Sequence, residues 1–366
     1  MRFGLILAMT LVLISCATQV EPPRVYSAVE KTELLRATQT EDDSQALNIS
    51  ISVFEGESLD GLTARMMKPV AFAESRYIPY LLKQTLEESG FWGAVRVTPS
   101  IDVTAELNCQ GQLLAASAAV LELQLICRDA LGKLWLDDRF DTRIARDAYR
   151  QSAVDGPDPY QGIMIRIANR LADGLALLTD QDRRRLRDAA LLRYAQTLSP
   201  EGFDGYLAVN AEGRMQVQGL PASSDPMVAR VRRIRDSEYQ FIDAMDEQYR
   251  LIYQQMNVPY RLWRQYQYEF EDYNTSLGDR SAGAQRRAVA SYEVMLATYK
   301  RYQDYKRNED ELSEMAQSLV RALSPTLGQV EGQVVELTGN LEQQYELWRS
   351  YLLRLYQAES SPRAPE

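Results

Sequence analysis

The sequence of 366 residues contains no histidine. Histidine is the commonest general base near neutral pH, the commonest metal ligand and the central residue of Ser-His-Asp and Cys-His catalysis. Its absence therefore excludes most sites of these kinds. Hydrolysis by two carboxylates remains chemically open, because it needs only paired Asp or Glu side chains.

Cysteine is also scarce, with only Cys16, Cys109 and Cys127 in the chain. Three cysteines without histidine do not make a zinc site of the usual kind, so we expect no metal site. We also expect no cofactor and no catalytic residues. Basic residues are outnumbered as well, since 41 Lys and Arg against 51 Asp and Glu give a formal net charge of -10. Such a charge repels the phosphates of nucleic acid, and a nucleic-acid partner is not expected.

The first fifteen residues have the pattern of a signal peptide. A single cation, Arg2, precedes an apolar run from Phe3 to Ile14. This run is too short for a bilayer core, which needs about 20 residues, but it suits the apolar part of an export signal. It ends in the segment Leu13-Ile14-Ser15-Cys16, which resembles the lipobox of bacterial lipoproteins. The resemblance implies cleavage after residue 15, lipidation of Cys16 and acylation of its new amino terminus, which together make a multi-chain membrane anchor.

The residue after the lipidated cysteine carries a second part of the resemblance. In this family a residue other than Asp implies transport to the outer membrane, and here the residue is Ala17. The resemblance therefore implies a lipid-anchored protein of the outer membrane that faces the periplasm. Residues 16–45 are mostly polar after the anchor and predict a flexible tether, and residues 359–366 predict a disordered tail.

Residues 46–180 have the pattern of a small α+β domain. Apolar residues alternate with polar ones over 47–53, as in a half-buried strand, and recur at helical spacing over 77–86. Pro79 is expected in or near the first turn of that helix, where a missing N–H is harmless. Further strands are expected over 95–97, 107–114, 119–128 and 133–140, followed by a helix over 163–178. The expected fold is a strand and a helix followed by an antiparallel meander.

The two remaining cysteines fall in the proposed hairpin of this meander. A loop centred near Ala118 places Cys109 directly opposite Cys127. Opposed residues of an antiparallel pair can meet the distances of a disulfide, and the periplasm is oxidising. We therefore predict a structural disulfide. The alternative is two buried free thiols that act as small apolar side chains.

The segment from Asp129 to Asp137 reads Asp-Ala-Leu-Gly-Lys-Leu-Trp-Leu-Asp, a tight turn that leads into a strand. With its preceding strand, helix and meander, this domain resembles the periplasmic domains of the curli secretion lipoprotein, the flagellar outer-membrane lipoprotein and the lipoprotein activators of penicillin-binding proteins. The resemblance implies a fold, which carries no function by itself. No pore-forming or activator residue maps onto this chain. Trp135 is expected in the core of the meander rather than in a ligand site.

Residues 181–358 are expected to form a mainly helical domain with long helices. Apolar residues follow helical steps from Val228 to Met256, and Pro259 is expected to stop or kink that helix. Glycines at both ends and in the middle of residues 328–339 predict a short hairpin. Other helices are expected over 260–273, 282–305, 309–323 and 341–357.

Tyrosine is concentrated in this second domain. Tyrosine buries a large apolar area while keeping a polar tip, which suits both helix packing and partner surfaces. The candidate partner-binding aromatics are Tyr266, Tyr268, Phe270 and Tyr273. Residue 268 points away from the helix face shared by the other three, so at least one aromatic should be exposed or meet a partner. The simpler interpretation is packing between helices.

These features predict a non-catalytic envelope lipoprotein that acts as a scaffold, tether or regulator of other envelope proteins. Its expected partners are the membrane, through the lipid, and a protein of the envelope. The alternative is a lipoprotein that binds peptidoglycan or another polysaccharide by aromatic stacking. A two-carboxylate glycan hydrolase is less favoured, because the local candidates Asp137-Asp138 and Glu271-Asp272 are adjacent, and neighbours on a strand point apart.

Overall fold

The computed structural model describes most of the chain between residues 32 and 360 and confirms the α+β fold class. The described residues are 32–38, 46–56, 62–144, 148–149, 156–222, 224–283, 299–300, 302–304, 306–315, 326–330, 333–337 and 339–360. The signal peptide, the predicted lipidation site Cys16 and the last six residues lie outside them.

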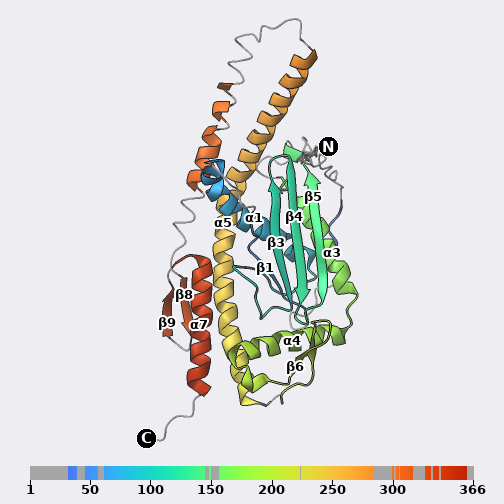
Figure 1. Ribbon diagram of the computed structural model, residues 1–366, viewed down its shortest axis with the longest axis vertical. Helices are drawn as coiled ribbons and strands as arrows, with labels where there is room; N and C mark the ends of the chain where they lie inside the picture. Colours follow the sequence, from blue (N-terminus) through green and yellow to red (C-terminus); the bar gives the residue numbers. More distant parts are fainter. Residues whose placement is uncertain are drawn as a thin grey trace, which may run out of the picture.

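A mixed sheet of five strands forms the first part of the molecule (Figure 1). Its strands are β1 (Ile49–Ser52), β2 (Val95–Thr98), β3 (Leu107–Ala116), β4 (Val120–Asp129) and β5 (Leu134–Arg143). They lie in the order β2-β1-β3-β4-β5, with β1 parallel to both of its neighbours. Strands β3, β4 and β5 form the predicted antiparallel meander.

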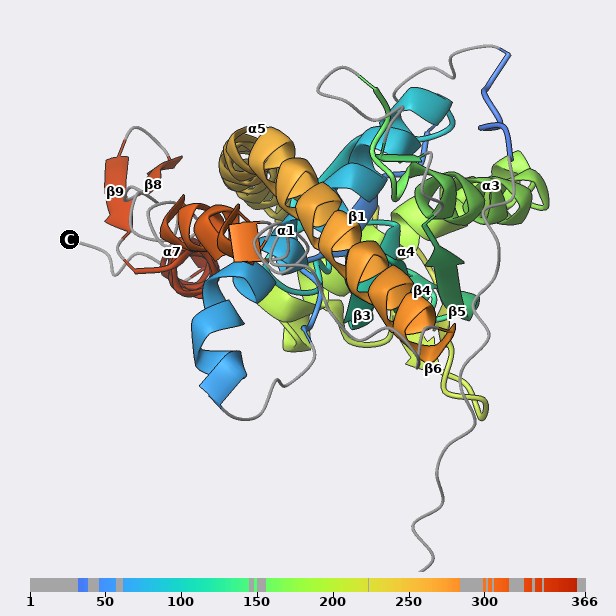
Figure 2. The same cartoon turned by 90° about the horizontal axis from the view of Figure 1, so that it is seen from above.

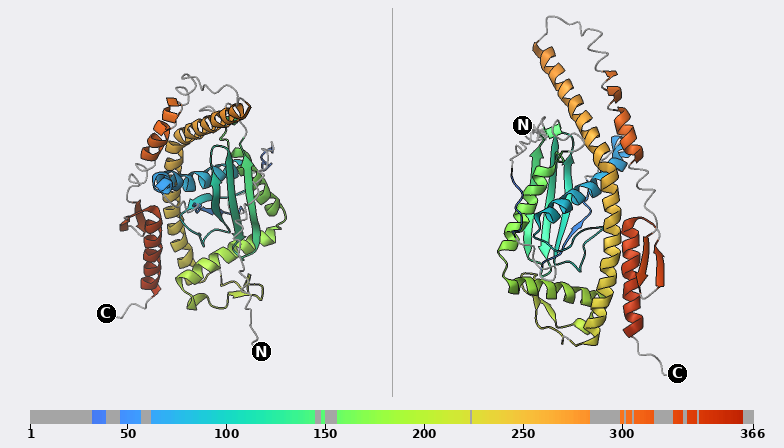
Figure 3. Two further views of the ribbon diagram at one scale, coloured as in Figure 1. Left: turned by 45° about the horizontal axis from the view of Figure 1, so that its top comes forward. Right: turned by 180° about the vertical axis from the view of Figure 1, so that it is seen from behind.

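Two helices, α1 (Leu62–Ser89) and α3 (Gln161–Ala176), cover one face of this sheet (Figure 3). The strand residues alternate accordingly: Cys109 and Leu113 of β3 are buried, whereas Gln110 and Gln112 are exposed on the other face. Along the middle of β3 the sheet therefore has one covered apolar face and one open polar face, whereas β1 is buried on both faces.

Pro79 lies well inside α1 rather than in its first turn, so the prediction for this residue was wrong. Proline lacks an N–H, which leaves the carbonyl four residues earlier, that of Ser75, without its helical donor. The Phe54 N–H, just after β1, donates to that carbonyl at 2.8 Å. The helix tolerates the proline because a neighbouring strand end replaces the lost hydrogen bond.

The longest element is α5 (Pro226–Gly283), a helix of 58 residues. It continues through Pro259, so of the two predicted outcomes, a stop or a kink, the stop does not occur, and the helix expected over 260–273 is part of α5. The helix does change direction along its length, as the kink alternative allows (Figure 1). Its upper part extends beyond the top of the sheet (Figures 1 and 3).

The remaining elements surround the lower part of α5. They are α4 (Asp180–Leu198), the 3₁₀ turn η1 (Glu201–Phe203), β6 (Leu207–Val209), β7 (Met215–Val217), β8 (Thr326–Val330), β9 (Gln333–Leu337) and α7 (Leu341–Ser360). The hairpin expected over 328–339 is present as β8–β9. Figure 2 shows α7 and this hairpin on the side of α5 that faces away from the sheet.

The core is continuous across the predicted domain boundary at residue 181. Buried apolar side chains from Leu47 to Tyr356 belong to one cluster, because α5 packs against α1 and β2. Residues 32–38, which lie within the predicted tether, contact the folded body. The Leu35 N–H donates to Asn169 Oδ1 at 2.9 Å, and the Ala37 N–H to the Ser89 carbonyl at 2.8 Å, so this segment is bound to the folded body.

Among the described residues, no helix has both the length and the apolar character needed to cross a bilayer.

Candidate functional site

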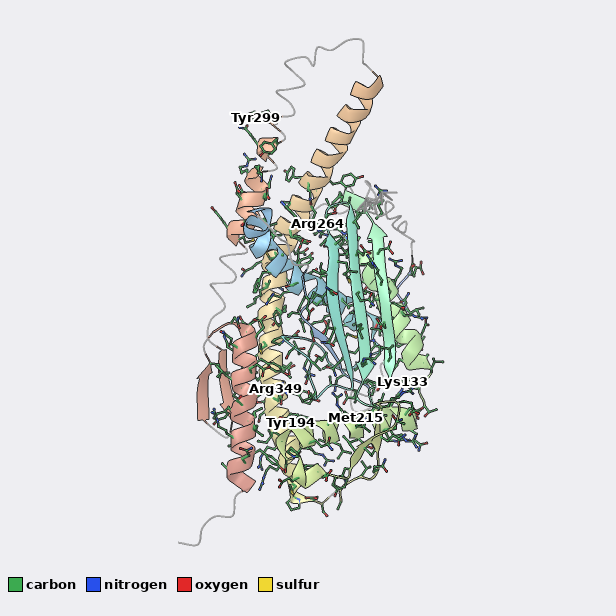
Figure 4. All side chains as sticks on the ribbon, viewed as in Figure 1. Lys133, Tyr194, Met215, Arg264, Tyr299 and Arg349 are labelled. Atoms are coloured by element: carbon green, nitrogen blue, oxygen red, sulfur yellow. A yellow bond between two sulfur atoms is a disulfide. The ribbon has the colours of Figure 1, made fainter. Side chains whose placement is uncertain are left out.

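Helix α5 is joined to the α+β part of the molecule by a buried ion pair between Arg264 and Asp158. Figure 4 labels Arg264 on α5, near the top of the sheet. Arg264 Nη2 donates to Asp158 Oδ2 at 2.8 Å, and Nη1 donates to Oδ1 at 3.3 Å. The two side chains are 0% and 2% exposed. A buried bidentate pair fixes one relative position of its two segments, because any shift leaves a desolvated charge without its partner.

Tyrosines complete the surroundings of this pair. The Arg264 guanidinium lies 4.0 Å from the ring centroid of Tyr160 and 4.3 Å from that of Tyr260. The hydroxyl of Tyr77, on α1, donates to Asp158 Oδ2 at 2.6 Å. Cation–π contacts and charged hydrogen bonds are both strengthened when water is excluded. Helix α1, the segment before α3 and helix α5 thus meet around one guanidinium.

A second buried acid, Glu74 of α1, accepts a hydrogen bond from the Tyr260 hydroxyl at 2.6 Å. Burial raises the pKa of Glu74 to about 7, although this hydrogen bond and the charge of Arg264 act in the opposite direction. Burial alone would also raise the pKa of Asp158, but the charge and hydrogen bonds of Arg264 hold it below its ordinary value. Asp158 is therefore the ionised partner, and Glu74 exchanges its proton near neutral pH.

We expect Glu74→Gln to reduce the loss of stability that accompanies a rise in pH from 4.5 to about 7. In this window the folded protein keeps a proton on Glu74 that the unfolded chain has lost, so the free energy of unfolding falls as pH rises. Glutamine does not titrate, and the fall should shrink by on the order of 1–3 kcal/mol. Part of it remains, because burial raises the pKa of Glu238 to about 7 as well.

Urea unfolding midpoints measured at several pH values test this expectation. The matched control is Glu88→Gln, which changes an exposed acid on the same helix. Equal pH slopes for the two variants would contradict the assignment of the titration to Glu74.

The four aromatic residues predicted as a partner surface do not form one strip. Tyr266 is 38% exposed. Tyr268 is half-buried and packs against Tyr149, with 5.4 Å between ring centroids. The backbones of Phe270 and Tyr273 belong to α5, but their side chains lie outside the described part of the structure. Tyr268 is therefore explained by packing within the protein, whereas Tyr266 lies at the surface.

Exposed apolar residues on α5 continue from Tyr266, the first of the predicted aromatics, towards the N-terminus of the helix. Leu251, Leu262 and Tyr266 are 37%, 39% and 38% exposed, and half-buried Val258 lies between the first two. Steps of seven, four and four residues keep them on one side of a helix. We call these four residues the α5 stripe. The helical spacing of these four residues is visible in the sequence. The prediction of a partner surface depended on the concentration of tyrosines instead, and it therefore included only Tyr266 of the stripe.

Cys109 and Cys127 are directly opposed in the β3–β4 register and form a disulfide. Both cysteines are buried. The predicted pairing is confirmed against the alternative of free thiols, and it closes the central hairpin of the meander.

The turn before β5 is explained by its own hydrogen bonds. Asp129 Oδ1 accepts the N–H groups of Leu131 and Lys133, each at 2.9 Å, and Oδ2 accepts the indole N–H of Trp135 at 2.9 Å. Gly132 has a φ of +80°, a left-handed conformation that favours glycine. Half-buried Trp135 packs against the core, as predicted, and the motif builds a turn.

The acidic pairs considered for hydrolysis do not converge. Asp137 accepts a hydrogen bond from Gln124 at 2.7 Å, whereas Asp138 lies 3.9 Å from Arg170 on α3, on the other side of the strand. The side chains of Glu271 and Asp272 lie outside the described residues. In the part of the chain that the structure describes, no three Cys, Asp or Glu side chains gather in a way that could hold a metal ion.

The ion pair itself was not predicted. Asp158 stands in a Gly-Pro-Asp-Pro segment between two predicted elements, where an acid is ordinarily solvated. The sequence position of Arg264 does indicate that this residue is buried. It lies four residues after Tyr260, on the helix side that also carries buried Tyr253 and Met256. A cation within such an apolar line indicates a buried partner, but the sequence does not say which acid supplies it.

Comparison with known protein families, with curated proteins and with solved structures finds no match for this chain. The function must therefore be inferred from the residues and contacts of the chain itself.

Proposed function

We propose that this protein is an envelope lipoprotein, anchored in the outer membrane through Cys16, that acts as a non-catalytic scaffold for another envelope protein. The observation that carries the scaffold role is α5. Its lower part is built into the core, while its upper part continues beyond the sheet (Figures 1 and 3).

We call the part of α5 that follows Arg264, up to Gly283, the arm. The ion pair explains how the arm keeps a defined direction. Arg264 is fully buried, and nineteen further residues of α5 follow it to Gly283. At 1.5 Å per residue this part is about 28 Å long. A helix held at a buried bidentate pair presents its outer part at a fixed angle, which favours a partner surface over a loose linker.

The α5 stripe supplies the chemistry for a protein partner. Its residues Leu262 and Tyr266 flank the Arg264 level, and both keep more than a third of their surface exposed. Leu and Tyr side chains on a preformed helix bury apolar area with little loss of backbone entropy when a partner helix docks. Tyr299 and Tyr302, in the helical segment that follows, are exposed as well, at 57% and 44%.

A photoreactive amino acid at Tyr266 tests the scaffold role in intact cells of the natural host. We expect defined adducts with one or a few envelope proteins. The matched control places the same group at Leu177, an apolar residue after α3 that is 82% exposed. Adducts with cell-wall glycan at Tyr266 would instead favour the polysaccharide-binding alternative. The same adducts from both positions, or none from Tyr266, would contradict a partner surface on α5.

A further inference from the structure

The open face of the sheet carries a hollow of about 790 Å³ that the scaffold role does not use. Gln110 and Gln112 of β3 and Gln124 of β4 line it on the sheet side. Two arginines line it from helices outside the sheet: Arg193 from α4 and Arg349 from α7. We call this feature the sheet-face hollow. Three amides and two guanidiniums thus line the hollow from three separate parts of the fold, and Glu55, just after β1, is the one acid in the lining.

Arg193 is a half-buried cation without a counter-charge in contact. Within the described chain it makes no hydrogen bond and no ion pair. Burial lowers the pKa of Arg193, and the more distant charges of Asp102 and Asp129 offset this only in part. Removing a guanidinium from water without a partner costs free energy, so such a group at the wall of a hollow marks a place for an anion.

Arg349 is the second cation, and its pairing within the protein is weak. Its nearest carboxylate atoms, from Glu238 and Glu346, lie 3.8 and 3.9 Å away. Burial, helped by the neighbouring charge of Asp102, raises the pKa of Glu238 to about 7, so this acid is only partly ionised at neutral pH. Figure 4 shows Arg349 and Tyr194 close together where α4, α5 and α7 meet. No carboxylate of the described residues therefore lies within hydrogen-bond distance of Arg349, so its N–H groups can still donate to a ligand.

We propose that the sheet-face hollow binds a small ligand through a carboxylate held between Arg193 and Arg349. The planar guanidinium donates two parallel hydrogen bonds to a carboxylate, and two such groups give both charge and orientation. The three glutamines offer donors and acceptors to a polar body, and Ile101 and Ile126 offer apolar contact. The net charge of -10 disfavours a large polyanion, so the ligand is a small one.

The carboxylate can belong to the C-terminus of a peptide or to an acidic sugar, and titration calorimetry on the purified wild-type protein distinguishes them. The probes are tri-alanine, its C-terminal amide and glucuronate. We expect tri-alanine or glucuronate to saturate the protein below about 10 mM, while the amide does not bind. Tri-alanine alone identifies a peptide carboxylate, and glucuronate alone an acidic sugar. Binding of the amide as tightly as the acid, or of no probe, overturns the proposal.

Substitution of Arg193 tests the site independently of the anchor and of α5. Arg193→Gln should weaken binding of the active probe at least tenfold, as expected for loss of a charged hydrogen bond. The matched control Arg184→Gln removes an exposed arginine from the same helix and should leave binding unchanged. Because Arg193 has no partner to lose, its variant should unfold at the wild-type temperature or higher. Equal affinities for the two variants, or a lower unfolding temperature for Arg193→Gln, would refute the site.

Discussion

Arg264→Met should lower the free energy of unfolding by about 3–5 kcal/mol, the usual cost of removing one partner of a buried ion pair. Methionine fills a similar volume, so the loss comes mainly from Asp158, which stays buried without its counter-charge. The rings of Tyr160 and Tyr260 lose their cation as well. Urea unfolding followed by circular dichroism measures the change. Because the substitution acts where α5 meets α1, limited proteolysis should also cut the arm faster than in the wild type.

A double-mutant cycle shows whether the pair, rather than either residue alone, causes this loss. Replacing both members, as in Arg264→Met with Asp158→Leu, should cost less than the sum of the single changes, because no charge is then left unpaired. Arg250→Met is the matched control, since it removes an exposed arginine of the same helix whose partner, Glu247, is also exposed. Its effect on stability should be near zero. Equal losses for Arg264→Met and Arg250→Met would rule out the ion pair as the joint between the two parts.

Cys16→Ser should move the protein from the outer-membrane fraction to the soluble periplasm. On the proposed function the thiol of Cys16 carries the lipid through a thioether, and a hydroxyl does not replace it there. The multi-chain anchor is then lost as a whole, and none of the described helices can take over as a membrane span. Membrane fractionation and intact-mass analysis measure the change, with the acyl mass expected on the wild type alone.

Ala17→Asp provides the matched control for that experiment. The lipobox resemblance implies that this variant is still lipidated but stays in the inner membrane. The comparison of the two variants therefore distinguishes a protein that has lost its lipid from a lipidated protein that is not transported to the outer membrane. If the wild type is soluble and carries no acyl mass, the lipobox interpretation is wrong and the scaffold has no anchor. The sheet-face hollow would be unaffected by that outcome, because it depends on the folded body alone.

Sequence reasoning succeeded where the signal was local. Alternating residues over 47–53 predicted β1, and the meander followed from strands joined by short turns. The disulfide was predictable for the same reason, because a single hairpin register places Cys109 opposite Cys127. The β8–β9 hairpin followed from glycines that flank β-branched residues. In each case the residues that decide the structure lie within about twenty positions of one another.

Only the tertiary structure decided the features that depend on distant partners. Pro79 could sit inside α1 because Phe54 replaces its missing hydrogen bond. Asp158 became a buried ion because Arg264 of α5, 106 residues later, pairs with it. Local propensity states what a segment prefers alone, whereas desolvation and pairing depend on which segments the fold brings together. The sequence by itself thus determined the elements and the candidate anchor, and the tertiary structure decided how α5 is held and where unpaired charge remains.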